Sequence, residues 1–178
     1  MSPRSVPPVK IRPWDAGDLW VLRRLLGDPK MMLHLGGAET PEAIEARHTR
    51  YLDSDPAKNG LFAIVIDEEP EPVGWVGYWE TLWHGELVWE CGWHVVPEAQ
   101  GRGVASSAVR LLLDDARARG THRFAHALPA IGNAASNALC RALGFASLGE
   151  VDVEYPKGSI MRSNDWRLDL RAGTERRS

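Results

Sequence analysis

The chain has 178 residues, of which 44% are hydrophobic and 25% charged, and this composition is typical of a globular protein with one domain. A formal net charge of −3 provides no positive field for nucleic acid or an anionic membrane, so small molecules and proteins are the expected partners. No apolar run reaches the ~18 residues of a membrane span, and the proline-containing start "MSPRSVPPVK" lacks the apolar segment of a secretory signal, so we expect a soluble, cytoplasmic protein.

The first third of the chain predicts a strand followed by two helices. The strand is "VKIRPW", and a helix begins at Asp15 or Asp18, because "DLWVLRRLLGD" places its leucines on one face. Gly27 and Pro29 end this helix. After the loop "MMLHLGGAET", Thr40 is a good N-cap for a second helix, "PEAIEARHTRYL".

The middle of the chain predicts an antiparallel meander of three strands. The apolar run "GLFAIVI" is the first strand, and the charged, proline-rich turn "DEEPEP" separates it from "VGWVGYWETLW". The turn "HGE" then leads into "LVWECGWHVV". Short connections of this kind join antiparallel neighbours.

The last third alternates helices and strands. An amphipathic helix follows Gly103 and ends at Gly120, and the strand "HRFAHALP" and the helix "NAASNALCRALG" precede two final strands, "FASLGEVDVEY" and "SIMRSNDWRLDL". The order β-α-α-β-β-β-α-β-α-β-β predicts one mixed α/β domain. This domain spans residues 8–170, between a flexible N-terminus at 1–7 and a polar tail at 171–178.

The two cysteines, Cys91 and Cys140, both lie in apolar runs, and neither has a paired metal-ligand spacing. Buried free thiols in a reducing cytoplasm are therefore favoured over a disulfide. We expect no metal site.

A glycine-rich turn, "QGRG", joins a strand to the helix after Gly103. The N–H groups that begin a helix attract an anion, and Gly101 and Gly103 let the backbone approach it closely. Arg102 can add a charge-assisted hydrogen bond. The turn lacks the lysine of a P-loop and follows a meander, unlike a dinucleotide fingerprint. The alternative is a tight connection that binds nothing.

The segment "QGRGVA", Gln100 to Ala105, is similar to the Q/R-x-x-G-x-G/A motif of the GNAT superfamily of N-acetyltransferases. The predicted element order is that of the family, and "NAASNALCRALGF" resembles its N-x-x-S-…-L-G-F segment. The resemblance covers roughly residues 8–170 and looks closest to the branch of ribosomal-protein N-terminal acetyltransferases, through "WECGWHVVPEAQGRGVA". It implies a mostly antiparallel twisted sheet of about seven strands with helices on both faces, and acetyl-CoA as co-substrate without a metal.

The resemblance also implies which residues hold acetyl-CoA. The backbone of His94, Val95 and Val96 would lie along the pantetheine, with an N–H at a strand bulge polarising the acetyl carbonyl. Asn133 would hydrogen-bond the pantetheine and also cap its helix. The residues of the turn and first helical turn would hold the pyrophosphate: Gln100, Gly101, Arg102, Gly103, Val104, Ala105 and Ser106. For Val95 and Val96, a place in the core is the alternative.

Acetyl transfer to an amine needs a neutral amine, a stabilised oxyanion and a proton for the leaving thiolate. Glu90 is the candidate general base, directly or through water, and its alternative role is an ion pair with a basic neighbour. Many family members carry a tyrosine seven residues after the asparagine, where this chain has Cys140. A thiol with its ordinary pKa of ~8.5 could donate a proton, but a buried thiol more often serves only to pack the core. Ser136, which matches a serine of the branch, is the stronger candidate acid.

Strand alternation suggests where the amine binds. On one strand three tryptophans alternate with polar residues, and on the next Glu90 and His94 alternate with apolar ones. If the two strands pair with the tryptophans on the apolar face, the opposite face gathers polar side chains: Tyr78, Glu80, His84, Glu86, Glu90 and His94. We therefore expect Tyr78, Glu80 and His84 to bind substrate, and a solvated sheet face is the alternative.

These features predict an acetyl-CoA-dependent N-acetyltransferase in which a primary amine attacks the thioester directly. A protein N-terminus and a small-molecule amine both remain open as acceptor, and the loop "MMLHLGG" is expected to help form the acceptor site. The alternative function is a catalytically silent acyl-CoA-binding sensor or scaffold, favoured by the missing tyrosine. Eight tryptophans leave room for a homodimer surface.

Overall fold

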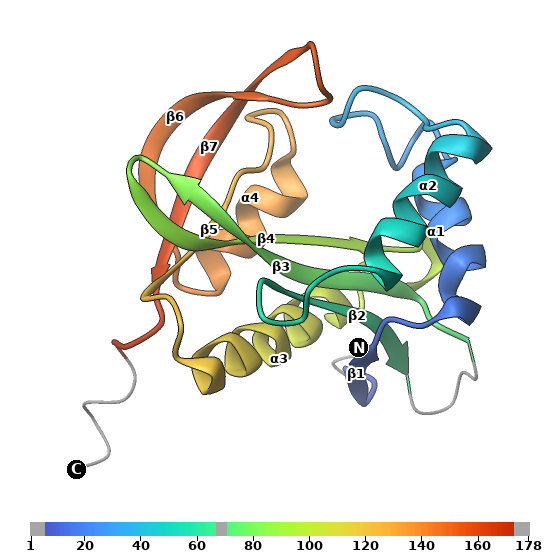
Figure 1. Ribbon diagram of the computed structural model, residues 1–178, viewed down its shortest axis with the longest axis horizontal. Helices are drawn as coiled ribbons and strands as arrows, with labels where there is room; N and C mark the ends of the chain where they lie inside the picture. Colours follow the sequence, from blue (N-terminus) through green and yellow to red (C-terminus); the bar gives the residue numbers. More distant parts are fainter. Residues whose placement is uncertain (1–5, 67–70, 173–178) are drawn as a thin grey trace, which may run out of the picture.

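The computed structural model describes residues 6–66 and 71–172 (Figure 1). This part of the chain forms one seven-stranded sheet in the order β1-β2-β3-β4-β5-β7-β6. The strands are β1 (Val9–Pro13), β2 (Asn59–Ile66), β3 (Gly74–Trp83), β4 (Glu86–Val95), β5 (Phe124–Ala127), β6 (Ala146–Glu154) and β7 (Ile160–Asp169). The helices are α1 (Leu19–Leu26), α2 (Pro41–Leu52), α3 (Val104–Arg119) and α4 (Ala134–Ala142), with short 3-10 helices η1 (Ala16–Asp18) and η2 (Pro97–Ala99).

The predicted element order and mixed α/β class are confirmed, because every predicted strand and helix is present in sequence. Most of the predicted flexible N-terminus (1–5) and polar tail (173–178) lies outside the described residues, as does 67–70 of the turn "DEEPEP". None of the described helices is both long and apolar enough to cross a membrane.

The predicted helix boundaries follow from local capping. The Asp15 side chain accepts a hydrogen bond at the start of η1, which leads directly into α1, and the Thr40 side chain caps α2 in the same way. The helix α3 lies between two glycines in the left-handed region, Gly103 with φ of 78° and Gly120 with φ of 66°. Asn133 caps α4. Each of these residues is a recognisable start or stop signal in the sequence.

All neighbouring strands are antiparallel except β4 and β5, which are parallel and pair only at Trp89 with Ala125 and at Glu90 with His126. The strand β5 ends one residue later at Ala127, whereas β4 continues to Val95. Within residues 6–66 and 71–172, the carboxyl-terminal half of β4 therefore has no paired strand on its β5 side.

Helices cover the sheet on both faces. The Tyr78 hydroxyl of β3 donates a hydrogen bond to Asp115 of α3, and Trp75 of the same strand packs its ring 5.9 Å from Tyr51 of α2. Because residues three apart on a strand point to opposite sides, α3 and α2 lie on opposite faces. We name them the α3 face and the α2 face.

Asn137 fastens α4 to the sheet. Its amide donates hydrogen bonds to the carbonyl oxygens of Ala130 (3.0 Å) and Asn133 (2.8 Å). Its Oδ1 accepts from Asn164 Nδ2 (2.8 Å) and Trp166 Nε1 (2.9 Å) of β7. The strand register places Trp166 on the α3 face, so α3 and α4 share that face.

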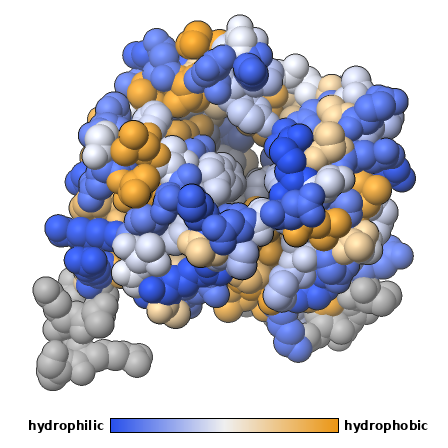
Figure 2. All heavy atoms as spheres, viewed as in Figure 1, coloured by the Kyte–Doolittle hydropathy of each residue, from blue (hydrophilic) through white to orange (hydrophobic). Residues whose placement is uncertain are grey.

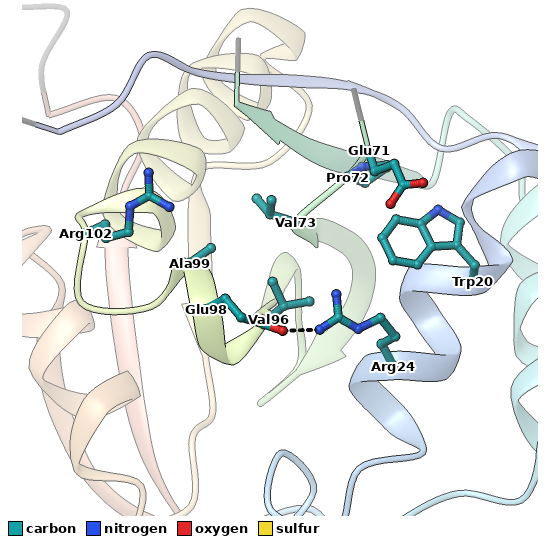
Figure 3. Close-up of a pocket in the computed structure, with 9 residues that line it drawn as sticks. All are labelled: Trp20, Arg24, Glu71, Pro72, Val73, Val96, Glu98, Ala99 and Arg102. Atoms are coloured by element: carbon teal, nitrogen blue, oxygen red, sulfur yellow. Dashed lines mark hydrogen bonds and ion pairs between the residues drawn. The ribbon is translucent and has the colours of Figure 1, made fainter. Parts of the chain in front are cut away.

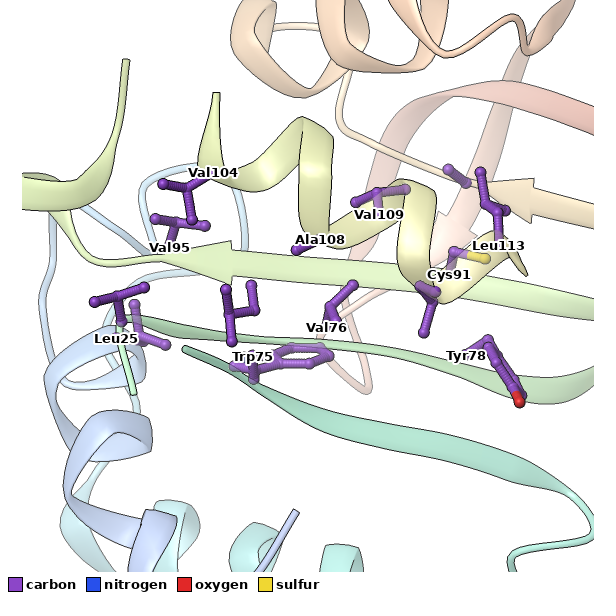
Figure 4. Packing of buried hydrophobic residues seen from close by; sticks show 14 of the residues in the cluster. Leu25, Trp75, Val76, Tyr78, Cys91, Val95, Val104, Ala108, Val109 and Leu113 are labelled. Atoms are coloured by element: carbon purple, nitrogen blue, oxygen red, sulfur yellow. The ribbon is translucent and has the colours of Figure 1, made fainter. Parts of the chain in front are cut away.

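The hydrophobic core is one cluster in which buried residues of α1, α2 and α3 join those of the sheet (Figure 4). Val95 of β4 lies beside Val104 at the start of α3 (Figure 4), and Val76 of β3 belongs to the same buried cluster as Ala108 and Leu113 of α3. The free thiols predicted for the two cysteines, Cys91 and Cys140, are confirmed, and both are buried.

The predicted pairing of the two faces of the β3-β4 hairpin is wrong. The connection is a two-residue turn, His84 and Gly85, with φ of 48° and 84°, and such turns require positive φ at both positions. The predicted turn, "HGE", has three residues, one more than the observed turn. A shift of one residue in the pairing moves the side chains of a strand to the opposite face. Tyr78 and Glu80 therefore lie on the α3 face, away from Glu90. The α2 face instead combines Glu90 with the three alternating tryptophans, Trp75, Trp79 and Trp83.

Candidate active site

The glycine turn follows β4 and η2 and leads into α3. Gly101 and Gly103 have φ of 68° and 78°, a conformation that L side chains disfavour. The Gln100 amide donates a hydrogen bond to the Val95 carbonyl oxygen (2.8 Å) and so holds the turn against the end of β4. The turn is thus fixed by backbone conformation and by one side-chain contact to the strand.

Several backbone N–H groups of the turn are available to a ligand. The first helical hydrogen bond of α3 runs from Ser107 N to the Gly103 carbonyl (3.0 Å). A β-carbon built on Gly101 would meet no atom within 4 Å, so open space borders this backbone. Among the described residues, no acceptor is found for the N–H groups of Gly101, Gly103, Val104, Ala105 and Ser106. This arrangement favours an anion with several oxygens.

A pocket beside the turn carries the predicted residue Arg102 on one wall (Figure 3). Arg24 of α1 forms an ion pair with Glu98 across the pocket and lies over the Trp20 ring. The other lining residues are mostly apolar: Pro72, Val73, Val96 and Ala99, with Glu71 at the rim. The pocket therefore adds charge next to the turn but contains none of the candidate proton acceptors.

The unpaired edge of β4 exposes two more N–H groups. Val96 N donates to the Val73 carbonyl (2.8 Å), and alternation along an antiparallel strand then turns the N–H groups of Trp93 and Val95 to the β5 side. By the same alternation the His94 N–H points toward β3. The sequence motif identified Val95 but missed Trp93, because it does not say where β5 leaves β4.

The predicted bulge in β4 is wrong, since the register with β3 is unbroken from Gly74 and Val95 to Trp83 and Glu86. The departure of β5, rather than a bulge, frees the edge of β4. The side chain of Val95 is buried against α3, as the alternative reading of this residue expected.

Glu90 lies at the last paired position of β4 and β5, on the α2 face. Its Oε2 accepts a hydrogen bond from the Thr81 hydroxyl (3.0 Å). Burial raises the pKa of the Glu90 carboxyl, opposed by hydrogen bonds from Thr81 and Trp79 and by the charge of His126. A carboxylate with a raised pKa is a better proton acceptor than an ordinary one.

His94, on the same face, is neutral near physiological pH. Burial lowers the pKa of its imidazole to about 4, and the charge of Arg47 on α2 acts in the same direction. The ring packs 5.5 Å from that of Trp75. His94 thus packs as an uncharged side chain on the α2 face.

A buried histidine and aspartate beside Glu90 escaped the sequence analysis. His126 Nδ1 lies 2.6 Å from Asp165 Oδ1, and the two residues are 5% and 4% exposed. Asp165 Oδ2 also accepts from Trp83 Nε1 (2.9 Å). His126 is the strand partner of Glu90. The sequence carried a signal for His126, the one polar residue of the core strand "FAHA", but none for Asp165, which stands among other polar residues in "SNDWRL".

The residues predicted on α4 have different surroundings. The Oδ1 atom of Asn133 accepts a hydrogen bond from Ser136 N (3.1 Å), which confirms its capping role, and Ser136 is half-buried on the first helical turn. Cys140 is wholly buried in the core, and burial raises the pKa of its thiol to about 12. These surroundings favour packing as the role of Cys140.

The residues predicted to bind substrate lie apart from Glu90. The Tyr78 hydroxyl is bound to Asp115, and Glu80 lies 3.0 Å from His122 Nε2, both on the α3 face. His84 occupies the exposed hairpin turn. Their assignment depended on a shared face that the register does not provide.

A hollow opens in the middle of the molecule, between the part that carries α4, β6 and β7 and the part that carries α1 and α2 (Figure 2). The loop "MMLHLGG" borders the second part, and its Gly36 lies so close to the β6-β7 turn that a β-carbon built on it would be 2.6 Å from Pro156 Cδ. His34 of the same loop approaches Gly132, which precedes α4. Loops from both parts therefore meet over the sheet.

Comparison with known proteins is consistent with this geometry. Residues 9–146 match the family model of an acetyltransferase (GNAT) domain. No curated protein sequence matches the chain. Similar solved structures include a spermidine N-acetyltransferase from Vibrio cholerae with CoA and spermine (TM-score 0.74, 18% identity, 91% of this chain and 95% of that chain covered).

Two further solved structures are similar over nearly their whole length. RimL, a ribosomal alpha-N-protein acetyltransferase in complex with coenzyme A, has a TM-score of 0.75 at 18% identity, covering 96% of this chain and 98% of that chain. An aminoglycoside acetyltransferase in complex with coenzyme A has a TM-score of 0.76 at 19% identity, covering 96% and 100%. At these identities the likeness establishes a shared fold.

Proposed function

The chain belongs to the GNAT family of acetyl-CoA-dependent N-acetyltransferases, and we propose that a primary amine bound on the α2 face attacks the thioester directly, with Glu90 as the general base. One observation carries the proposal. The end of β4 combines the N–H groups of Gly101 and Gly103 to Ser106, an unpaired strand edge and a half-buried carboxyl on the same strand.

The donor site is proposed from the fit of the turn to a pyrophosphate. Its oxygens would be bound by the available N–H groups of Gly101, Gly103, Val104, Ala105 and Ser106, and the helix dipole of α3 adds roughly 0.3–1 kcal/mol. Arg102 would add a charged contact, while Gln100 keeps the turn in place through the Val95 carbonyl. Asn133 would hydrogen-bond the pantetheine. When bound, acetyl-CoA supplies the thioester carbonyl that the amine attacks.

The unpaired edge of β4 would stabilise negative charge on the carbonyl oxygen. The N–H groups of Val95 and Trp93 point to the side from which β5 has departed, so no carbonyl of a described strand competes for them. Fixed backbone donors of this kind stabilise developing charge without reorganising.

Glu90 would take the proton of the amine. A lysine amine titrates near ~10.4 and an α-amine near ~7.8, so both are largely protonated at pH 7. The raised pKa of the Glu90 carboxyl favours this transfer. Ser136, half-buried on the first turn of α4, is the proposed proton donor to the thiolate.

The acceptor is proposed to be a primary amine, either a protein N-terminus or a small-molecule amine. The similar structures include enzymes named for spermidine, an aminoglycoside and a ribosomal protein. The acceptor would enter through the central hollow (Figure 2).

The test is release of free thiol from acetyl-CoA by the purified protein, with mass spectrometry of each amine. The panel contains an N-terminal peptide, spermidine and an aminoglycoside. We expect acetylation of at least one class. Tight binding of CoA without turnover on any amine would instead support the acyl-CoA-binding sensor.

We also propose a cytoplasmic location, supported by two free buried thiols. A homodimer is proposed through the β3-β4 hairpin, because Leu82 and Leu87 face each other across it while 67% and 48% exposed. Sedimentation of the protein and of a Leu82→Ser variant tests this, and an unchanged monomer mass for both would contradict it.

A further inference from the structure

We infer that His126, oriented by Asp165, is a positioning residue that keeps Glu90 in its proton-accepting form. The inference rests on the proposed function, in which Glu90 is the general base. It concerns the strand next to Glu90, which the glycine motif does not include.

His126 lies beside Glu90 on the neighbouring strand. Glu90 and His126 are partners across the parallel ladder, so their side chains lie next to each other on the α2 face. This is the last paired position before β5 ends. A charge on His126 therefore acts at the point where the unpaired edge of β4 begins.

A hydrogen bond to Asp165 orients the His126 ring. With Nδ1 committed to the carboxylate at 2.6 Å, the ring has one orientation and Nε2 is left as its other polar atom. Asp165 is itself held by the Trp83 indole. Hydrogen bonds from His126 and Trp83 outweigh the effect of burial and lower the pKa of Asp165, so the aspartate is ionised and can balance an imidazolium.

The charge of His126 acts on the protonation of Glu90. A positive imidazole beside a buried carboxyl favours the ionised form, and the charge of His126 lowers the pKa that burial has raised. The proton that Glu90 takes from the amine N–H would then pass to water, since the neighbouring positive charge makes protonated Glu90 less stable. The base is thereby restored for the next turnover.

Other charged groups face this cluster. His84 in the hairpin turn acts on Asp165, and Arg167 of β7 is the strand partner of His126. The Arg167 guanidinium lies 4.5 Å from the centre of the Phe124 ring. Cys91, the next residue of β4, points to the opposite face; burial raises the pKa of its thiol, and the charge of Glu90 raises it further. His126 alone among these groups combines the adjacent strand position with a buried carboxylate partner.

The experiment compares pH profiles of kcat/KM for the parent and for His126→Gln. Because glutamine carries no charge, we expect the acidic limb to move to higher pH, on the order of one unit. The matched control is His122→Gln, since His122 is also paired with a glutamate but lies on the α3 face. A shift no larger than that of the control would overturn the inference.

A double variant separates action through Glu90 from other effects. In a Glu90→Gln background, His126→Gln should leave the pH profile unchanged, because the base that it assists is absent. A shift that persists in this background would mean that His126 acts elsewhere.

A measurement without turnover separates the effect on Glu90 from effects on catalysis. The carboxyl carbon of Glu90, followed by NMR against pH, should titrate at higher pH in His126→Gln than in the parent and in His122→Gln, with the amide spectrum of each variant recording that the fold is kept. Equal midpoints in the three proteins would overturn the inference. This readout needs no turnover, so failure to acetylate any amine would count against the proposed function alone.

Discussion

At the scale of single residues, the proposed donor site depends on backbone conformation more than on side chains. Gly101 and Gly103 adopt φ values that other residues occupy only with strain of about 1–2 kcal/mol. The motif that contains them is readable in the sequence because only glycine satisfies this requirement cheaply. The glycine turn is therefore the part of the site that can best be predicted from a single sequence.

Replacing Gly103 by valine is expected to weaken acetyl-CoA binding by tenfold or more, about 1.4 kcal/mol. The change disfavours the left-handed conformation, and its β-carbon would lie 3.0 Å from Val6 Cγ2. Both effects redirect the N–H groups that follow. Isothermal titration with CoA measures the affinity.

The control for this prediction is Gly120→Val, at the other end of α3. Gly120 has a similar φ of 66°, and its β-carbon would meet only the Arg117 carbonyl, at 4.0 Å. The two variants should lose similar stability, but Gly120→Val should bind CoA normally. Equal CoA affinities for the two variants would contradict the proposal that the turn binds the pyrophosphate.

Glu90→Gln is expected to stabilise the protein at neutral pH. The folded state holds the Glu90 proton more tightly than the unfolded chain does, because its pKa is raised. Ionisation therefore costs stability as pH rises above the ordinary carboxyl pKa, and glutamine avoids this cost. The gain should disappear at pH values below that pKa. Urea unfolding at pH 4 and pH 7.5 measures it, with exposed Glu86→Gln as control, and a gain that is independent of pH would contradict the argument.

The same residue scale shows where sequence reasoning stops. His126 and Asp165 are 39 positions apart and meet only because β7 is inserted between β5 and β6. Alternation assigns each of them to a face of its own strand. It does not say which strands are neighbours, so a contact of this kind has no local signal.

At the scale of elements, helices were predictable and strand pairing was less so. Thr40, Asn133 and Gly120 mark helix ends through interactions within a few residues. The hairpin turn was ambiguous, because His84 has to adopt a positive φ, which is uncommon for residues other than glycine. One residue in that turn decided which side chains share a face with Glu90.

Asn137→Ala is expected to lower the free energy of unfolding by about 2–4 kcal/mol. The variant leaves the buried Trp166 indole and the Asn164 amide without their shared acceptor, and frees the Ala130 carbonyl. Denaturant unfolding measures the loss. Asn164→Ala, which removes one of these bonds, should cost less, and equal costs would show that Asn137 does not hold α4 to β7.

At the scale of the whole molecule, the two faces of the sheet separate the proposed donor and acceptor. The glycine turn leads into α3 on one face, whereas Glu90 and His126 lie on the other. They meet at the unpaired edge of β4. The element order was readable from local patterns, but this division was not, because no local pattern specifies where parallel strands part.

Loops from the two parts of the molecule meet over the proposed acceptor entrance, and two adjacent glycines test their importance. A β-carbon on Gly36 would lie 2.6 Å from Pro156 Cδ, whereas one on Gly37 would meet nothing within 4 Å. Their φ values of 89° and 93° make the backbone strain equal. Gly36→Ala should therefore push the α1-α2 loop away from the β6-β7 turn, which lies beside it in Figure 1.

We expect Gly36→Ala to raise the KM for the amine severalfold while the affinity for CoA stays unchanged, because the donor turn lies on the other side of β4. Steady-state kinetics with varied amine, together with CoA titration, distinguish the two sites. Gly37→Ala should resemble the parent protein. If both variants raised the KM equally, backbone strain in the loop would be the cause, and the contact with Pro156 would have no part in holding the entrance.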